Sequence, residues 1–294
     1  MKKTIILLLA VFWSVILTAQ TAEISIPFKM EELTSPQFVK AVEKAGGVCV
    51  IPLGIIEKHG PHLPLGTDLF EIREVATTAA KKEYAVVFPP YYLGQIFEAR
   101  HQPGTLAYSH ELVWKMLEET CTELSRNGLK KIILANGHGG STNLLQYFCQ
   151  TQLESQKDYI VVFFQSGSDP ETAQEIKSLR KATLDSHAGE GETSMMFFIR
   201  PDLVDQNAIK SESGLNQERL KGLKNGYTGI WWYANFPNHY ASNVDEPNKR
   251  LGELLVTSSA SQLAGLIKYL KTNNSIEELQ NEFNKRAANP LMKY

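Results

Sequence analysis

The chain has few cysteines, almost no net charge and no long apolar run beyond its first residues. Its three cysteines, Cys49, Cys121 and Cys149, are odd in number and lie in apolar stretches, so they predict buried thiols rather than a disulfide framework. A net charge of -2 with interspersed signs gives no basic face for nucleic acid, which favours a small molecule as the partner. The sequence also lacks G-x-S-x-G, so it predicts no nucleophile elbow of a serine hydrolase.

The longest apolar run lies at the N-terminus, where Lys2 and Lys3 precede mostly apolar residues from Ile5 to Leu17. This run is shorter than the ~20 residues that cross a bilayer, so we expect no stable membrane association. A basic start, an apolar segment and a small, polar end are typical of a secretory signal peptide. We therefore expect a signal peptide over residues 1–22, a single domain over 23–294, and an exported protein that is periplasmic or secreted.

Apolar strands alternate with amphipathic helices along most of the chain. Such alternation predicts βαβ units and an α/β fold with a mostly parallel sheet covered on both faces. An aromatic segment at about 202–249 interrupts the pattern and is expected to be ordered. The expected strands are 46–53, 84–93, 129–135 and 158–165, and the expected helices are 34–44, 68–83, 109–128, 142–156, 169–183, 191–199, 250–271 and 275–287.

Acidic and imidazole side chains gather in three segments that follow predicted strands. "GIIEKHGPHLPLGTD" (54–68) follows the first strand, "ANGHGGS" (135–141) follows the third, and "DSHAGEGETS" (185–194) comes after the fourth. Ligands of open parallel sheets bind beyond the carboxyl ends of the strands, so we expect these segments to converge. The side chains that would meet are Glu57, His59, Asp68, His138, His187, Glu190 and Glu192.

This mixture of carboxylates and imidazoles suits Zn, Mn or Fe better than Ca, which prefers oxygen ligands alone. Glu57 and His59 point to the same side of an extended segment, and the glycine and prolines that follow can turn Asp68 back toward them. A single E-x-H pair is a weak signal, because a lone histidine is more often a hydrogen-bonded loop residue. Carboxylates gathered from three loops would repel one another without a cation, so together they predict a metal site.

The three motifs, in this order, resemble the creatininase (creatinine amidohydrolase) family, and "HQPGTLAYS" (101–109) resembles its intervening loop. The resemblance covers about residues 45–250. It implies a three-layer α/β/α fold, two divalent metal ions, and a metal-activated hydroxide that cleaves a C–N bond of a small cyclic or linear amide. It also implies a homo-oligomer, often a hexamer. Because the family includes formamide deformylases and peptide-trimming enzymes, the substrate stays open.

The resemblance also implies a division of roles among these residues. Glu57 and His138 would hold one metal, His59 the other, and Asp68 would bridge both. His187 would pass a proton to the leaving nitrogen. The side chains of Asn136 and Asp185 are expected to orient these groups, and His62 is interpreted as a loop residue or a residue that orients the ligands.

One ligand of the family is missing. In creatininase the second residue after the "NGH" histidine is a metal-binding glutamate, whereas this chain has Gly140. We expect Glu192 to replace it and Glu190 to hydrogen-bond a ligand or the substrate. The alternative, in which Glu192 only caps its helix and one metal suffices, stays open.

Two departures from the family pattern bear on the substrate. Ser141 stands where "NGHGG" usually continues with Asn, and the segment around Trp231 and Trp232 is unusually aromatic. These tryptophans are expected either to stack on a planar substrate or to pack in the core, and creatinine is disfavoured as the substrate. Export also disfavours a deformylase of intracellular cofactor synthesis. The rival hypothesis is a non-catalytic, metal-containing periplasmic binding protein.

Overall fold

A parallel four-stranded sheet forms the centre of the computed structural model, which describes residues 26–167 and 169–291. Its order is β2–β1–β3–β4, with β1 at Val48–Leu53, β2 at Val86–Val87, β3 at Lys131–Asn136 and β4 at Ile160–Phe164. The expected signal peptide lies outside the described residues. The helices are α1 (Ser35–Lys44), α2 (Thr67–Lys82), α3 (His110–Arg126), α4 (Thr142–Thr151), α5 (Pro170–Leu179), α6 (Glu190–Ile199), α7 (Trp231–Asn235), α8 (Lys249–Thr272) and α9 (Ser275–Ala288).

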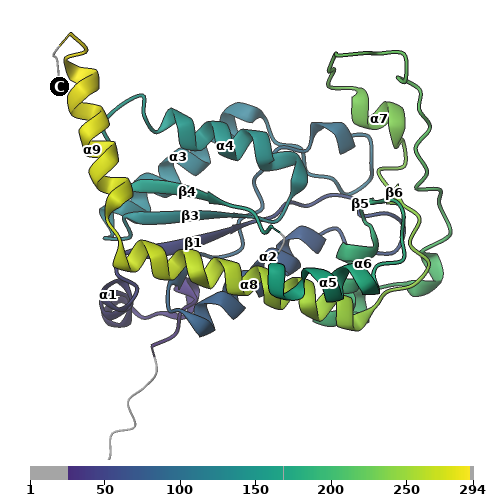
Figure 1. Ribbon diagram of the computed structural model, residues 1–294, viewed down its shortest axis with the longest axis horizontal. Coiled ribbons are helices and arrows are strands. Elements are labelled where there is room, and N and C mark those ends of the chain that lie inside the picture. The colour runs from purple at the N-terminus through teal and green to yellow at the C-terminus, as the bar shows by residue number, and fades with distance from the viewer. Residues whose placement is uncertain (1–25, 168, 292–294) are drawn as a thin grey trace, which may run out of the picture.

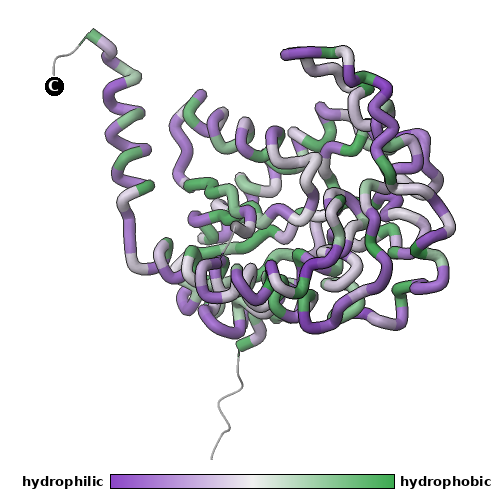
Figure 2. Tube along the Cα trace, turned by 45° about the vertical axis from the view of Figure 1, so that its right-hand side comes forward, coloured by the Kyte–Doolittle hydropathy of each residue, from purple (hydrophilic) through white to green (hydrophobic). Residues whose placement is uncertain are grey.

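Helices cover both faces of the sheet, which makes a three-layer α/β/α arrangement. Helices α3 and α4 lie on one face and α2 and α8 on the other (Figure 1). Neighbouring side chains of a strand point to opposite faces, so both faces of each central strand must be apolar. In β1, Val48 and Val50 pack toward α2 and α8, whereas Cys49 and Ile51 pack toward α3 and α4. Figure 2 shows the resulting concentration of hydrophobic residues along the central strands.

The strand order places a topological switch point between β1 and β3. From β1 the chain crosses through α2 to β2 on one side, and from β3 it crosses through α4 to β4 on the other. The two connections lie on opposite faces, so the loops after β1 and β3 diverge and leave a crevice at the carboxyl ends of the strands. The segments 54–68 and 135–141 are these two loops, as the sequence predicts.

Two glycines allow the start of α2 to approach this crevice closely. A Cβ atom on Gly54 would lie 2.6 Å from the backbone nitrogen of Leu69, and a Cβ atom on Gly137 would lie 2.7 Å from the Cβ of Ile72. Any side chain at either position would push the helix away from the sheet. Gly54 and Gly137 therefore set how near Asp68, in the first turn of α2, comes to the strand ends.

The structure differs from the sequence prediction at two places. The strand expected over residues 84–93 is wrong for most of its length, because β2 has only two residues and is followed by Pro89 and Pro90, which lack a backbone N–H. A small antiparallel pair, β5 (Asp185–His187) and β6 (Ala241–Ser242), was not expected. In the described part of the chain, no helix combines the length and apolar character of a membrane span.

Candidate metal centre

The carboxyl ends of β1 and β3 and the start of α2 bring three of the predicted ligands together. Glu57 Oε1 and Asp68 Oδ2 lie 2.9 and 3.1 Å from Nδ1 of His138. All three side chains are buried, yet neither carboxylate oxygen accepts a hydrogen bond. Buried carboxylate oxygens normally have a hydrogen bond each, so two that share one imidazole nitrogen fit a site for a cation.

A second group shares Asp68 and adds His59 and Glu192. His59 Nε2 lies 3.0 Å from Asp68 Oδ1, and one ligand atom from each of the three residues lies within 4.8 Å of the others. Glu192 is half-buried in the first turn of α6, where its Oε2 accepts a 2.6 Å hydrogen bond from the backbone N–H of Ala188. Asp68 thus presents one oxygen to each group, as expected of a bridging carboxylate.

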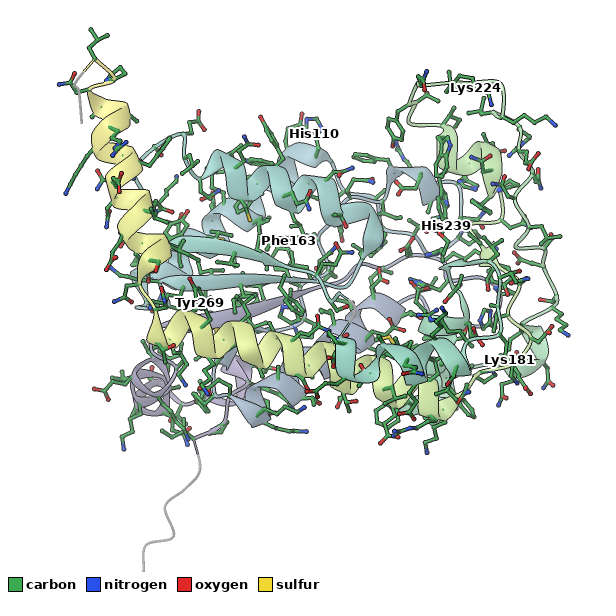
Figure 3. The ribbon with its side chains drawn as sticks, viewed as in Figure 1. His110, Phe163, Lys181, Lys224, His239 and Tyr269 are labelled. Atoms are coloured by element: carbon green, nitrogen blue, oxygen red, sulfur yellow. The ribbon has the colours of Figure 1, made fainter. Side chains whose placement is uncertain are left out.

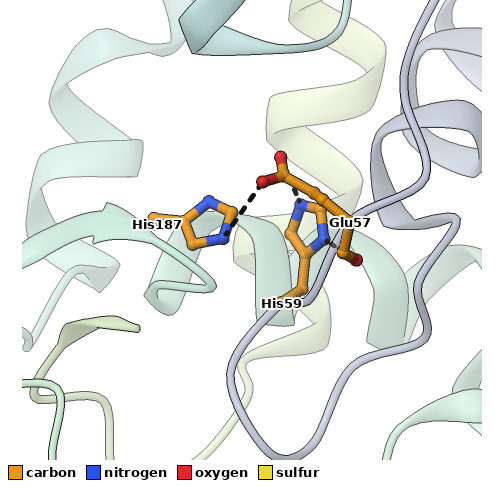
Figure 4. Close-up of side chains that lie close together, drawn as sticks. All are labelled: Glu57, His59 and His187. Carbon is orange, nitrogen blue, oxygen red and sulfur yellow. Dashed lines mark hydrogen bonds and ion pairs between the residues drawn. The ribbon is translucent and has the colours of Figure 1, made fainter. Parts of the chain in front are cut away.

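His187, at the end of β5, stands beside both groups. Its Nε2 lies 3.9 Å from Glu57 Oε2, and its ring centre is 4.5 Å from that of His59 (Figure 4). Nε2 also lies 2.9 Å from the carbonyl oxygen of Lys58, which can only accept, so Nε2 carries the proton of this bond. The lone pair of a neutral His187 is therefore on Nδ1.

The charges of the site shift one another's pKa values strongly. Burial alone would raise the pKa of Glu57, but His138 and His187 outweigh it and hold that pKa well below its ordinary value. Burial likewise favours neutral His59, but Asp68 and Glu57 raise its pKa to about 10. Without a metal, the two groups therefore hold ionised carboxylates and protonated imidazoles, and a cation would have to displace those protons.

The comparison with known proteins agrees with this geometry. The sequence model of the creatininase family, described as creatinine amidohydrolase, matches residues 31–267. The chain belongs to the creatininase family. Creatinine amidohydrolase of Pseudomonas putida is 25% identical over 192 residues, which are 60% of this chain and 74% of that protein. A mycofactocin precursor peptide peptidase of Mycolicibacterium smegmatis is 30% identical over 161 residues, 53% of this chain and 59% of that protein.

Solved creatininases also share the fold. A manganese creatininase superposes with a TM-score of 0.70 at 21% identity, covering 84% of this chain and 99% of that one. This likeness confirms the expected three-layer α/β/α architecture with a mostly parallel central sheet. It places the crevice at the ends of β1 and β3 within a fold that the family shares.

The resemblance to creatininase predicts a metal-binding glutamate at position 140, where this chain has glycine. A Cβ atom there would lie 2.5 Å from His138 Nε2 and 3.0 Å from Glu98 Oε1, so the present position of His138 requires glycine. No side chain at 140 can reach a metal, and Glu192 lies with His59 and Asp68 instead. Glu192 thus lies beside His59 and Asp68, and its role as a metal ligand stays a prediction.

The expectation for Glu190 is not supported. Both of its carboxylate oxygens accept hydrogen bonds from the backbone N–H of Lys181, and Oε2 also accepts one from Ala182, at 2.9 to 3.0 Å. Positions 190 and 192 differ by about 200° around the helix axis, so they face different ways. Glu190 anchors the 181–182 segment to α6 and belongs to none of the candidate ligand groups in the described residues.

Three further residues are expected to orient the ligands, and the structure brings one of them, Asn136, to a candidate ligand. Asn136 accepts a 3.2 Å hydrogen bond from the backbone N–H of His138, so it fixes the turn that carries this residue. Asp185 pairs instead with Arg180 and caps α6 through the N–H of Gly191, and it contacts no candidate ligand. His62 is buried against Thr193 Oγ1 at 2.8 Å, outside the ligand groups.

Sequence reasoning missed His239, whose ring contacts Glu57. Figure 3 places His239 near β5 and β6, where the aromatic segment returns to the site. Its Nε2 hydrogen-bonds Glu57 Oε2, and its Nδ1 accepts a 2.8 Å hydrogen bond from the indole N–H of Trp232. An indole nitrogen can only donate, so a neutral His239 carries its proton on Nε2 and donates it to Glu57.

The pKa of His239 agrees with this assignment. Burial lowers that pKa to about 4, despite the opposing pull of Glu57, so the ring is neutral near pH 7. Trp232 therefore fixes the tautomer of His239, and His239 fixes the Glu57 carboxylate. Trp232 is thus largely a packing and orienting residue, whereas Trp231 is exposed. No local pattern in "FPNHYAS" indicates this role, because it depends on the pairing of β6 with β5.

Proposed function

We propose that this creatininase-family chain is a metal-dependent amidohydrolase that cleaves a C–N bond of a small cyclic or linear amide. The observation that carries the proposal is the pair of buried oxygens, Glu57 Oε1 and Asp68 Oδ2, which share Nδ1 of His138 and have no other hydrogen-bond partner within the described ranges. Two carboxylates that face one nitrogen repel each other unless positive charge lies near them, and in the metal-free protein protonated imidazoles supply this charge in place of a metal ion. Donor chemistry, burial and family membership all support this function.

Two divalent ions fit the two groups. Glu57, Asp68 and His138 would hold one ion, and His59, Asp68 and Glu192 the other. Zn or Mn is supported, because solved creatininases include a manganese form and a zinc–zinc form, and Fe shares the same ligand preferences. Bound at these groups, the ions would supply an activated water and stabilise the negative charge that develops on the amide oxygen.

His187 is the proposed proton donor to the leaving nitrogen. Its Nε2–H is held by the carbonyl of Lys58, so Nδ1 is the atom that would take up a proton and deliver it. The rings of Trp232 and His187 make a T-shaped contact, with their centres 6.0 Å apart. This contact limits the orientations of the imidazole.

The family leaves the choice of amide open. Relatives of this chain are named as a creatinine amidohydrolase, a peptide peptidase and, in Methanobrevibacter smithii, a deformylase. Since all three names describe hydrolases, an enzyme is better supported than the rival of a non-catalytic binding protein. Peptide trimming and deformylation are the alternatives within the enzyme class.

The test combines metal analysis with amide hydrolysis by the purified chain. We expect two divalent ions per chain, loss of activity on chelation, and recovery on adding Mn²⁺ or Zn²⁺. Asp68→Ala should lose both ions, because this residue belongs to both groups, whereas Glu192→Gln should lose one. Glu190→Gln is the matched control, since Glu190 is a buried carboxylate on the same helical turn and contacts only backbone amides of 181–182.

The outcomes separate the proposal from its rivals. Full hydrolysis by metal-free Asp68→Ala would refute the metal-dependent mechanism. Two ions retained in Glu192→Gln would assign Glu192 to helix capping alone. Two bound ions without hydrolysis of any amide in a broad panel would support the non-catalytic binding protein.

We further propose that the chain is exported and assembles as a homo-oligomer, of which a hexamer is the favoured form. The basic and apolar N-terminal pattern supports export, and the resemblance to creatininase supports assembly. Mass spectrometry of protein recovered from the native cell should find a mature N-terminus near residue 23. Sedimentation should give a mass several times that of one mature chain. Retention of Met1, or a monomer at micromolar concentration, would contradict the respective proposal.

A further inference from the structure

A cavity of about 940 Å³ opens beside the candidate metal centre. Gln95 and Gly140 belong to its lining, and both adjoin His138: the carbonyl of Gln95 lies 2.9 Å from Nε2 of that residue. His138 thus turns Nε2 toward the cavity wall and Nδ1 toward Glu57 and Asp68. A ligand that fills the cavity lies next to the imidazole that helps to form the metal centre.

Helix α7 forms another wall of the cavity and also contacts the residues of the candidate metal centre. Ile230 and Tyr233, at the start and on the side of α7, line the cavity, whereas Trp232 of the same helix points to His239 and His187. Tyr233 packs edge-on against His101, which is another lining residue, with their ring centres 4.7 Å apart. Helix α7 therefore contributes to the cavity with one face and orients the ligand groups with the other.

Large apolar side chains line this cavity without being covered. The exposed fraction is 47% for Phe97, 85% for Tyr227 and 55% for Ile230. Exposed apolar side chains gathered around a concave surface are a usual mark of a binding site. The cavity therefore offers an apolar group of a ligand a place out of water.

One positively charged side chain in the cavity lining, Arg100, has no partner among the described residues. Arg100 is exposed at the lining, and it is the one arginine in the described part of the chain whose guanidinium makes no ion pair or hydrogen bond. The other arginines pair with carboxylates or, in the case of Arg219, with backbone carbonyls. A guanidinium is well shaped to bind a carboxylate through two parallel hydrogen bonds.

We propose that the substrate is an amide that carries both a carboxylate, bound by Arg100, and an apolar or aromatic group, bound against Phe97, Ile230 and Tyr233. This inference rests on the proposed hydrolase function and names its substrate class. Ligand cavities generally measure ~300–1,000 Å³, and this one lies near the upper end of that range, well beyond what a compact ring such as creatinine fills. An N-acylated amino acid or a short peptide has the required size, charge and apolar surface.

The test uses three amides with the same acyl group and the metal-loaded full chain. N-acetyl-L-phenylalanine carries the carboxylate and the ring, N-acetyl-L-phenylalaninol lacks the carboxylate, and N-acetylglycine lacks the ring. We expect kcat/KM to be at least tenfold higher for N-acetyl-L-phenylalanine than for either of the others. Arg100→Gln should remove the preference for the carboxylate through a raised KM and leave N-acetyl-L-phenylalaninol unchanged.

Arg126→Gln is the matched control, because Arg126 is an exposed arginine on α3 that pairs with Glu123 outside the cavity. Hydrolysis of the three amides at equal rates, or equal effects of Arg100→Gln and Arg126→Gln, would overturn the inference and leave the hydrolase function standing. If protein with two bound ions hydrolyses none of the three amides but does hydrolyse another amide of the broad panel, the inference is overturned and the hydrolase function stands; if it hydrolyses no amide of that panel, the hydrolase function fails. Calorimetric binding of N-acetyl-L-phenylalanine that is lost in Arg100→Gln would then still support the site.

The oligomeric mass of each variant is measured in parallel. An Arg100→Gln protein that changes mass without changing its preference among the amides would assign this wall to contacts between copies of the chain, and would overturn the inference. An Arg100→Lys variant should keep part of the preference, because it retains the charge but not the paired hydrogen bonds.

Discussion

Replacement of His239 by leucine tests whether the aromatic segment orients the metal centre. The substitution removes the hydrogen bond to Glu57 Oε2 and leaves the indole N–H of Trp232 without its acceptor. The bond to Glu57 is buried and the bond from Trp232 is partly buried, and His239 itself is only 2% exposed. Glu57 would then be free to turn away from His138 and Asp68.

The expected effect has two parts. A hydrogen bond to a charged group contributes ~1.5–3 kcal/mol, so the metal-free His239→Leu protein should lose roughly that much unfolding free energy. Residues that orient metal ligands typically affect metal affinity by 10–100-fold. The hydrogen bond from His239 to Glu57 is already present in the metal-free protein. Its removal therefore changes metal affinity only through the orientation of Glu57, and we expect metal affinity to fall about tenfold.

The assay is calorimetric titration of Mn²⁺ into chelator-treated protein, with tryptophan emission, to which Trp232 contributes, as a second signal. His239→Leu should weaken the ion held by Glu57 about tenfold without changing the number of ions bound at saturation. His239→Gln places an amide N–H near the former Nε2 position and should recover most of the affinity. His62→Leu is the matched control, because His62 is also 2% exposed but contacts no candidate ligand.

Unchanged affinity in His239→Leu would refute the orienting role. Equal losses in His239→Leu and His62→Leu would attribute the effect to general loosening of the loops around the site. A fall in the number of ions bound at saturation would instead indicate that His239 is itself a ligand.

Three further perturbations follow from the same geometry. Burial, with Glu192 and Asp68 nearby, raises the pKa of Glu71 well above its ordinary value. Metal-free protein should therefore lose stability as pH rises above ~4.5, because the folded state holds a proton that the unfolded state releases. Glu71→Gln should accordingly raise the Tm more at pH 8 than at pH 5. His59, with a pKa of about 10, is protonated at pH 7, so metal uptake should release protons and strengthen as pH rises, as calorimetry in several buffers would show. Gly140→Ala should weaken metal binding at least tenfold by displacing His138.

Each of these has a clear contrary result. Equal Tm gains at both pH values would show that Glu71 is not a buried neutral acid. Heats independent of the buffer would show that no proton leaves on binding. Wild-type metal affinity in Gly140→Ala would show that His138 can move without cost, which would weaken the argument that glycine is required there.

The elements of the central sheet were predictable because each one has a local signature. The apolar run at 46–53 became β1, and the helical spacing at 68–83 became α2 within one residue at each end. The prediction of a strand at 84–93 was wrong for most of its length. The segment stays apolar through Pro89 and Pro90, which lack a backbone N–H and cannot continue the hydrogen-bonded ladder. The pair β5–β6 joins segments more than fifty residues apart, and neither has a periodic pattern long enough to indicate a strand.

The sequence by itself determined which chemistry this protein can perform. E-x-H after a core strand, "NGHGG" after the next central strand and "HAGEGE" before a helix supply carboxylates and imidazoles at fixed chain positions, and strand order brings such loop ends together. Tertiary structure decided which of these groups meet. Glu192 faces His59 and Asp68 while Glu190 faces the backbone at 181–182, because two residues apart on a helix point in different directions. His239 reached Glu57 only through the pairing of β6 with β5, a contact that no local pattern encodes.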